Sequence, residues 1–240
     1  VGYFEVFLPS VVSSTPASAA IMGPPPPAAR AAITQQSCAM VYPWVSRHAM
    51  TEAAYQADAT KWDAANYRPI AVSANGSGSD ARFATIWIKD GQYGKNWILR
   101  HNMDGAEYQQ KYTDYKAAGY MLTVVDMYGT TASPRYVAIW VKNATLTLGS
   151  HGLGEASMQQ QIDEKAALGY RPLWVSGLGS ASNNSPAFSG AWVKDTLTGT
   201  LRINLTTEDI GAKGLARKMV NDGYHMTHLS GYTTLDGTRY

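Results

Sequence analysis

Residues 97–119 change from the pattern of a strand to the pattern of a helix. Residues 97–101 are rich in β-forming side chains and predict a short strand. Asp104 is suited to cap a helix that runs through Ala118, and Gly119 is suited to end it. Tyrosines recur along this stretch at the helical spacing of three to four residues: Tyr108, Tyr112 and Tyr115.

Residues 120–142 predict two further strands, joined by a turn over residues 129–133. In the last strand, residues 135–142, alternation places Tyr136, Ala138 and Trp140 on one face and Val137, Ile139 and Val141 on the other. Both faces are apolar, so we expect this strand to lie between the helix and a neighbouring unit. The predicted unit is therefore strand, helix, strand and strand.

The same unit recurs along the chain. The tryptophans Trp87, Trp140 and Trp192 close similar segments, and helices are predicted over residues 51–65, 154–168 and 207–222. A period of about 50 residues is typical of an array whose neighbouring units complete each other's core. We predict an α+β fold of about four such units with mostly antiparallel strands. Their predicted limits are residues 41–92, 93–145, 146–197 and 198–240, the last unit being incomplete.

The links between the units contain glycine, as in Asp90-Gly91 and Thr198-Gly199, and predict hairpins that tie adjacent units together. Residues 1–36 differ from the rest because alanine, serine and a run of four prolines accumulate there. This segment is predicted to be a leader or tether. Residues 37–240 are predicted to form the repeat domain.

Composition narrows the classes of partner. The chain has 20 basic and 18 acidic residues and a net charge of +2, without a cluster of lysine and arginine. Neither a nucleic acid nor an anionic membrane is therefore indicated as a partner. No apolar run approaches the roughly 20 residues that span a bilayer. Cys38 is the only cysteine, so the chain has no internal disulfide.

Three histidines recur where the first strand of a unit meets the helix: His48, His101 and His151, with Asn204 in the fourth place. Such residues either cap and pack the repeat or line a rim that binds a polar ligand, and they are our candidate binding residues. His225 and His228 are three residues apart on a predicted strand, which sends them to opposite faces. We expect no metal site and no cofactor.

Motifs for nucleophilic catalysis are missing from the chain. It contains no Gly-x-Ser-x-Gly, Ser-x-x-Lys or His-Glu-x-x-His sequence, so we assign no catalytic residue. Four Asn-x-Ser/Thr sequons fall near predicted loops or strand ends and are candidate glycosylation sites: Asn75, Asn143, Asn183 and Asn204.

The segment GYMLTVVDMYGTTASPRYVAIWVK at residues 119–142, echoed by GYRPLWVSG at 169–177 and ARFATIWIKD at 81–90, resembles a known repeat. It is similar to the tandem repeat at the N-terminal side of fungal polyglycine hydrolases and of some bacterial proteins. The resemblance implies a secreted protein in which a β-lactamase-like serine hydrolase domain follows the repeats and cuts glycine-rich linkers of plant defence chitinases. The catalytic serine and lysine belong to that later domain, whose motif is absent here.

The resemblance leads to a functional hypothesis. We expect the non-catalytic repeat domain of a secreted serine hydrolase, which recognises a protein substrate or braces the catalytic domain. Its partners would be the downstream β-lactamase-like domain of the same protein and a protein substrate such as a plant chitinase. The alternative is an autonomous secreted binding module, for instance for a glycan.

The fourth unit has an unusual end. Arg239-Tyr240 occupies the place of Arg135-Tyr136, so the strand supplied by VAIWVK in the second unit is missing there. Two segments could supply this strand: polypeptide beyond residue 240, or the N-terminal segment Gly2–Leu8. Continuation of the chain is the preferred interpretation, because Glu5 would otherwise fall at the buried position of Ala138.

Overall fold

A computed structural model describes residues 42–92, 94–142, 146–211 and 213–240. The predicted leader over residues 1–36, Cys38 and the segment Gly2–Leu8 all lie outside these residues.

Three units have the predicted order of strand, helix, strand and strand. The first consists of β1 (Trp44–Met50), α2 (Glu52–Ala64), β2 (Arg68–Asn75), the 3-10 turn η2 (Gly78–Asp80) and β3 (Arg82–Ile88). The second consists of β4 (Trp97–Met103), α3 (Gly105–Ala117), β5 (Tyr120–Thr130) and β6 (Ser133–Lys142). The third consists of β7 (Thr147–Leu153), α4 (Glu155–Ala167), β8 (Arg171–Ser180) and β9 (Asn183–Val193). The predicted repeat architecture is thus confirmed.

The helices α2 and α3 begin where a side chain can cap them. The side chain of Thr51 accepts a hydrogen bond from the amide of Ala54 at the start of α2, and Asp104 accepts one from Glu107 at the start of α3. Gly119 has a φ of +83° directly after α3, a conformation that favours glycine. The predicted cap and stop of this helix are confirmed.

The last strand of each unit occupies the centre of its sheet. The strand orders are β1-β3-β2, β4-β6-β5 and β7-β9-β8, and all of these pairs are antiparallel. The central strands carry the repeated tryptophans, and Trp87, Trp140 and Trp192 are almost completely buried.

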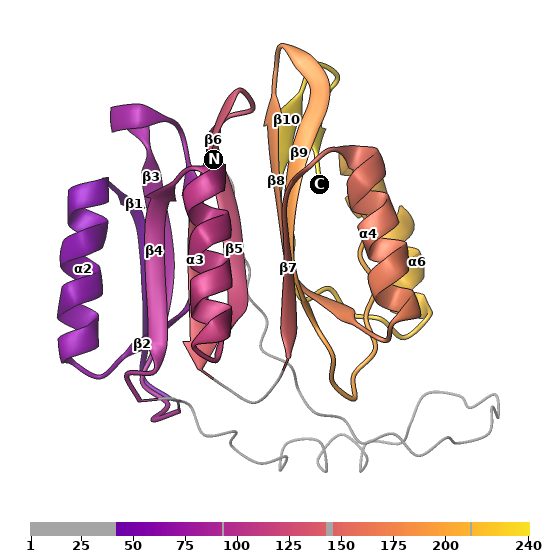
Figure 1. Cartoon of the computed structure of the whole chain (residues 1–240). Coiled ribbons are helices and arrows are strands. Elements are labelled where there is room, and N and C mark those ends of the chain that lie inside the picture. Colours follow the sequence, from indigo (N-terminus) through magenta and orange to yellow (C-terminus); the bar gives the residue numbers. More distant parts are fainter. Residues whose placement is uncertain (1–41, 93, 143–145, 212) are drawn as a thin grey trace, which may run out of the picture.

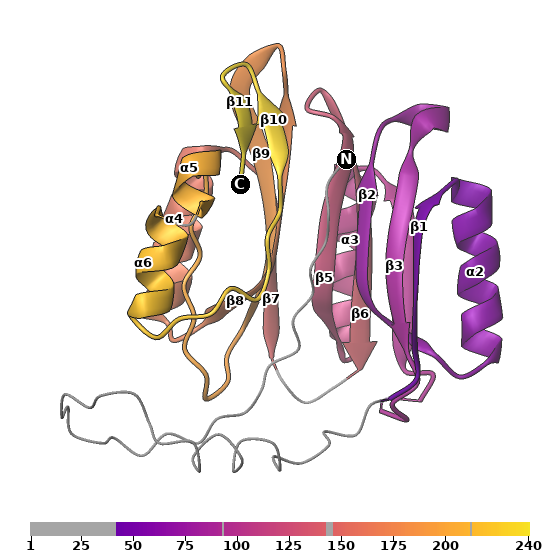
Figure 2. The ribbon, with the colours of Figure 1, turned by 180° about the vertical axis from the view of Figure 1, so that it is seen from behind.

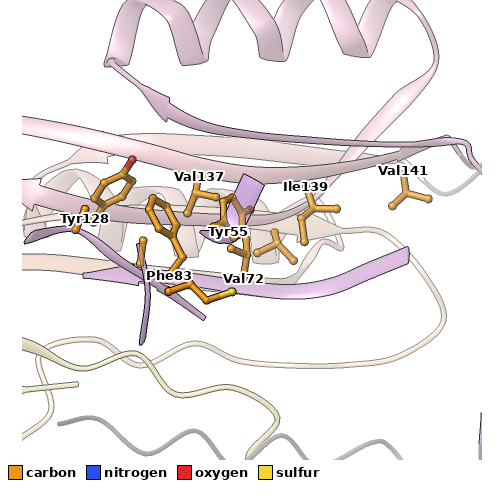
Figure 3. Packing of buried hydrophobic residues seen from close by; sticks show 11 residues of the cluster. Tyr55, Val72, Phe83, Tyr128, Val137, Ile139 and Val141 are labelled. Carbon is orange, nitrogen blue, oxygen red and sulfur yellow. The ribbon is translucent and has the colours of Figure 1, made fainter. Parts of the chain in front are cut away.

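The central strand of the second unit is buried on both faces, as its alternation predicts. Its residues Val137, Ile139 and Val141 belong to a core cluster with Tyr55 and Phe83 of the first unit (Figure 3). The opposite face, formed by Tyr136, Ala138 and Trp140, packs with Tyr108 of its own helix α3 and with Ala191 of the third unit. One strand therefore joins two cores.

Sheets of successive units lie face to face. β2 contacts β5, and β5 contacts β8. Figures 1 and 2 show the sheets side by side in chain order, with α2 at one end of the array and α4 and α6 at the other. Among the described residues, no helix has the length and apolar character needed to cross a membrane.

The prediction of hairpins between units is wrong. β3 pairs with β1 and β2 of its own sheet, whereas β4 pairs with β6 of the next sheet. A central strand already has a partner on each side, so β3 has no free edge for β4. Contact across this link comes instead from side chains: the rings of Trp87 and Trp97 meet edge to face at 5.9 Å.

The fourth unit departs from the predicted pattern. Instead of one helix over residues 207–222 there are two short helices, α5 (Thr207–Ile210) and α6 (Leu215–Asn221), because the backbone is extended at Gly211 and Gly214. Only a short hairpin follows, formed by β10 (Tyr232–Thr234) and β11 (Gly237–Arg239). The strand predicted to hold His225 and His228 is wrong, since residues 224–231 form no strand.

Replacing a central tryptophan should cost much of the stability of the array. We expect Trp140→Ala to lower the free energy of unfolding by about 3 to 5 kcal/mol, because it removes a fully buried aromatic ring and leaves a cavity. Chemical denaturation followed by circular dichroism measures this loss. Trp44→Ala is the control: Trp44 is 62% exposed, so its loss should change stability by only about 0.5 kcal/mol. Similar losses for both variants would contradict the structural role of Trp140.

Candidate functional site

A small polar residue recurs where neighbouring units meet. It lies six residues after each of the repeated tyrosines Tyr67, Tyr120, Tyr170 and Tyr224. The four residues at this position are Ser73, Asp126, Ser176 and Ser230. We call this set the polar ladder.

Each step of the polar ladder joins one unit to the next. The amide of Ala74 donates to Oδ2 of Asp126 at 2.8 Å. In the same way, Met127 donates to Oγ of Ser176 at 2.9 Å, and Gly177 donates to Oγ of Ser230 at 3.1 Å. One hydrogen bond thus repeats at all three boundaries between units. It satisfies an amide that lies beyond the reach of its own sheet.

Asp126 is the charged member of the polar ladder, and it is buried. Burial raises the pKa of its carboxyl group above the ordinary value. Hydrogen bonds from Ser176 and from Ala74 favour the charged form, and Ser73 adds a further one, but burial outweighs them. The hydroxyl of Ser176 donates a hydrogen bond to Asp126 and accepts one from the amide of Met127, so it acts as donor and acceptor at once.

The polar ladder was not found from the sequence. The available signal was a carboxylate in the middle of the apolar segment YMLTVVDMY, together with serine at the same place in the other units. A single serine is a weak signal, and only the structure shows that three of these side chains accept hydrogen bonds across the boundaries between units.

The candidate binding residue His101 lies at the boundary between the first and second units. Its Nδ1 is 3.3 Å from Oε1 of Glu52, and its Nε2 is 3.2 Å from Oε1 of Gln56, both on α2. Its ring meets Tyr55 edge to face at 5.2 Å. Burial lowers the pKa of His101, and the neighbouring Glu52 counters only part of this effect.

His151 occupies the corresponding boundary between the second and third units. Its ring lies 4.7 Å from that of Tyr108 and 5.5 Å from that of Tyr136, and it forms a hydrogen bond with the backbone of Gly105. Burial lowers its pKa as well. His48, in the first unit, is exposed. The two internal histidines therefore contribute to contacts between units, and a ligand role for all three stays a prediction.

Asn204 marks the third boundary but does not replace a histidine. Its φ of +60° matches Asn102 and Gly152, the residues that follow His101 and His151. Its Nδ2 nevertheless donates to Oε1 of Glu155 at 2.9 Å, a contact to the start of α4 like that of His101 to the start of α2. We call the edge of the array on which His101, His151 and Asn204 lie, one at each boundary between units, the rim.

A small polar cavity of about 100 Å³ opens on the rim between the third and fourth units. It is lined by Glu155, Asn184, Pro186, Asn204, Thr234, Asp236 and Arg239. Its carboxylates already have partners, because Asn184 donates to Oδ2 of Asp236 at 2.8 Å and Asn204 donates to Glu155. The cavity has room for a small polar group rather than for a large ligand.

The remaining candidates lie apart from one another. His228 contacts the carbonyl of Val175 at 2.7 Å and packs on the ring of Trp174, whereas His225 is exposed. Within the described ranges, no three His, Cys, Asp or Glu side chains are grouped so that they could hold a metal ion. Among the sequons, Asn75 is exposed at the end of β2, Asn183 begins β9, and Asn143 lies outside the described residues.

Comparison with known proteins identifies the repeat. A family model described as "polyglycine hydrolase-like, structural repeat" matches residues 41–90, 94–143, 150–195 and 213–240. These matches follow the four units of the structure. A search of the curated proteins found no match.

The buried carboxyl group of Asp126 should make stability depend on pH. Its pKa is raised in the folded protein, so its contribution is fully present below the unfolded pKa of about 4 and is lost as pH rises through the folded value. We expect the free energy of unfolding of the wild type, relative to Asp126→Ser, to fall as the pH rises above about 4. Serine is the matched replacement because Ser73, Ser176 and Ser230 hold the equivalent positions.

Denaturant titrations at several pH values measure this difference. Asp126→Asn serves as a second control, since its amide has a similar shape and does not titrate. Both variants should show the same pH dependence relative to the wild type. Parallel curves for the wild type and the two variants would contradict the raised pKa.

Proposed function

Because the chain belongs to the family of polyglycine hydrolase-like structural repeats, we propose that it is the non-catalytic repeat domain of a secreted serine hydrolase. Its work is to recognise a protein substrate or to brace the catalytic domain. The nucleophile and base of the reaction come from a β-lactamase-like domain of the same protein.

The observation that supports this proposal is that the repeated polar groups bond to, or pack against, other units of the array. The polar ladder bonds one unit to the next, and His101 and His151 pack against the neighbouring helix. A general base must reach a nucleophile and a substrate, whereas these groups face other parts of the array. Such an arrangement suits a rigid scaffold better than a reaction centre.

The rim is the surface that we propose for recognition. Side chains of two units meet at each boundary there, and the cavity lined by Glu155 and Arg239 opens on it. Its ligand is a folded protein such as a chitinase. A net charge of +2 gives no reason to include a nucleic acid or a membrane among the partners.

The purified chain should not hydrolyse a glycine-rich peptide. Mass spectrometry of the peptide after incubation measures cleavage, with a polyglycine hydrolase that retains its catalytic domain as the positive control. Recognition and bracing are separated by calorimetry: recognition requires binding to a chitinase with a glycine-rich linker, and bracing requires binding to the β-lactamase-like domain. Cleavage by the 240-residue chain, or binding to neither protein, would overturn the proposal.

Secretion through a eukaryotic pathway should add glycan to at least one of Asn75, Asn143 and Asn204. Asn75 is the best placed of the described sequons, because it is exposed at the end of a strand. Intact mass before and after glycosidase treatment measures the modification, and Asn75→Gln identifies that site. An unmodified mass from such a host would contradict the prediction.

A further inference from the structure

The first and third boundaries share a set of polar residues on the rim. At the first boundary, Tyr128 is buried, and its hydroxyl accepts a hydrogen bond of 3.0 Å from the amide of Asn102. The pKa of Tyr128 is raised to about 12, chiefly by burial. The carboxylate of Glu52 raises this pKa further, whereas the guanidinium of Arg135 lowers it, so both charged groups lie near the hydroxyl.

The third boundary repeats this arrangement. Tyr232 corresponds to Tyr128, and burial raises the pKa of Tyr232 to about 12 as well. Here the carboxylate that raises the pKa is Glu155, and the groups that lower it are the backbone of Asn204 and the guanidinium of Arg239. We call these two sets the first and the third quartet: Glu52, Asn102, Tyr128 and Arg135, and Glu155, Asn204, Tyr232 and Arg239.

The second boundary lacks all four of these residues. The corresponding positions have no polar side chain: Gly105, Gly152, Leu178 and Ala187. The space is used by Tyr136 instead, since a Cβ on Gly152 would lie 3.2 Å from the hydroxyl oxygen of Tyr136. The first and third units carry Phe83 and Phe188 in place of this tyrosine. Because the four positions change together, the quartet acts as a set.

The guanidinium groups of the two quartets have donors to spare. Among the described residues, Arg135 has no partner in a hydrogen bond or an ion pair. Arg239 donates only from Nη1, to the carbonyls of Asp236 and Thr238 at 3.3 and 3.2 Å. Its Nε and Nη2 therefore keep their protons for a ligand.

The carboxylates of the quartets have an acceptor oxygen to spare. Oε1 of Glu155 accepts from Asn204, and Oε1 of Glu52 faces His101. In the part of the chain that the structure describes, no ion pair joins the carboxylate of a quartet to its guanidinium. At the third boundary both groups line the cavity of about 100 Å³. A small ligand can therefore bridge the acceptor and the donor.

We propose that each quartet is a binding site for a primary carboxamide, the group that ends the side chains of asparagine and glutamine. The amide nitrogen of the ligand donates to the glutamate, and its carbonyl oxygen accepts from the arginine. The carboxamide belongs to a side chain of the protein recognised at the rim. The site thus rests on the proposed recognition and names a group that is recognised.

A neutral group with its donor and acceptor on separate atoms suits a quartet best. The arginine would repel a cation, and the glutamate would repel an anion. A hydroxyl carries donor and acceptor on a single oxygen, so it is less able to reach two groups that do not pair with each other. A peptide-bond amide has one N–H, whereas a primary carboxamide has two and also satisfies a second acceptor of the site.

Titration of the isotope-labelled 240-residue protein with acetamide, followed by nuclear magnetic resonance, tests the proposal. Acetamide is a minimal primary carboxamide, so we expect a dissociation constant in roughly the millimolar range. The backbone amides of Asn102 and Asn204 should shift until they saturate, whereas that of Gly152 at the second boundary should not. Acetate and N-methylacetamide, which resembles the peptide bond, should bind at least about fivefold more weakly.

Variants of the two quartets test them separately. Arg135→Met keeps a chain of similar length, and it should weaken binding reported by Asn102 at least about fivefold without changing the response of Asn204. Glu155→Ala should have the converse effect. Arg82→Met is the matched control, because Arg82 holds the same strand position in the first unit and donates to carbonyls of its own turn. It should leave both responses unchanged, and melting temperatures check the fold of every variant.

Several results would overturn the proposal: no saturable shift at either quartet, equal binding of acetamide and N-methylacetamide, an equal shift at the second boundary, or full binding by both Arg135→Met and Glu155→Ala. The titrations need neither chitinase nor the β-lactamase-like domain. Binding to a chitinase without a response to acetamide would therefore overturn the carboxamide site alone. A response to acetamide without binding to either protein would overturn the proposed function and leave the site.

Discussion

A strand that is apolar on both faces must be covered on both sides, and the architecture of this chain depends on that requirement. The central strand β6 places Trp140 under α3 of its own unit, but Val137 and Ile139 need the first unit to exclude water. No unit supplies both covers alone. Stability therefore resides as much in the boundaries as in the units, as expected for an array with nearest-neighbour coupling.

Apolar contact alone would not fix how far one sheet slides along the next, because dispersion and burial have little directionality. Hydrogen bonds are directional, and the polar ladder places one at the equivalent position of every boundary. A shift would leave the amides of Ala74, Met127 and Gly177 without acceptors in an apolar layer, which is costly. The ladder accordingly specifies register. Asp126 provides two acceptor oxygens, one for the amide of Ala74 in the first unit and one for the hydroxyl of Ser176 in the third, at the expense of burying a carboxyl group.

The repeat was predictable from the sequence because its signals are local. A cap such as Asp104, a stop such as Gly119 and the alternation around Trp140 each act within a few residues. The prediction of hairpins was wrong because a glycine in a link does not reveal which sheet the next strand joins. The partners of the histidines were equally invisible, since Glu52 and His101 lie in different units. In the fourth unit, propensity predicted one helix, but the chain is extended at Gly211 and Gly214.

The boundaries share one geometry but differ in chemistry. On the rim, a glutamate faces His101 at the first boundary, the backbone of Gly105 meets His151 at the second, and a glutamate accepts from Asn204 at the third. Equivalent sites for a repetitive polymer would require the same groups at each step. An uneven row of polar contacts is better matched by an irregular surface, because charge and hydrogen-bond complementarity must then be satisfied at several different points. For the recognition that we propose, this unevenness favours a folded protein over a repetitive glycan as the ligand of the rim.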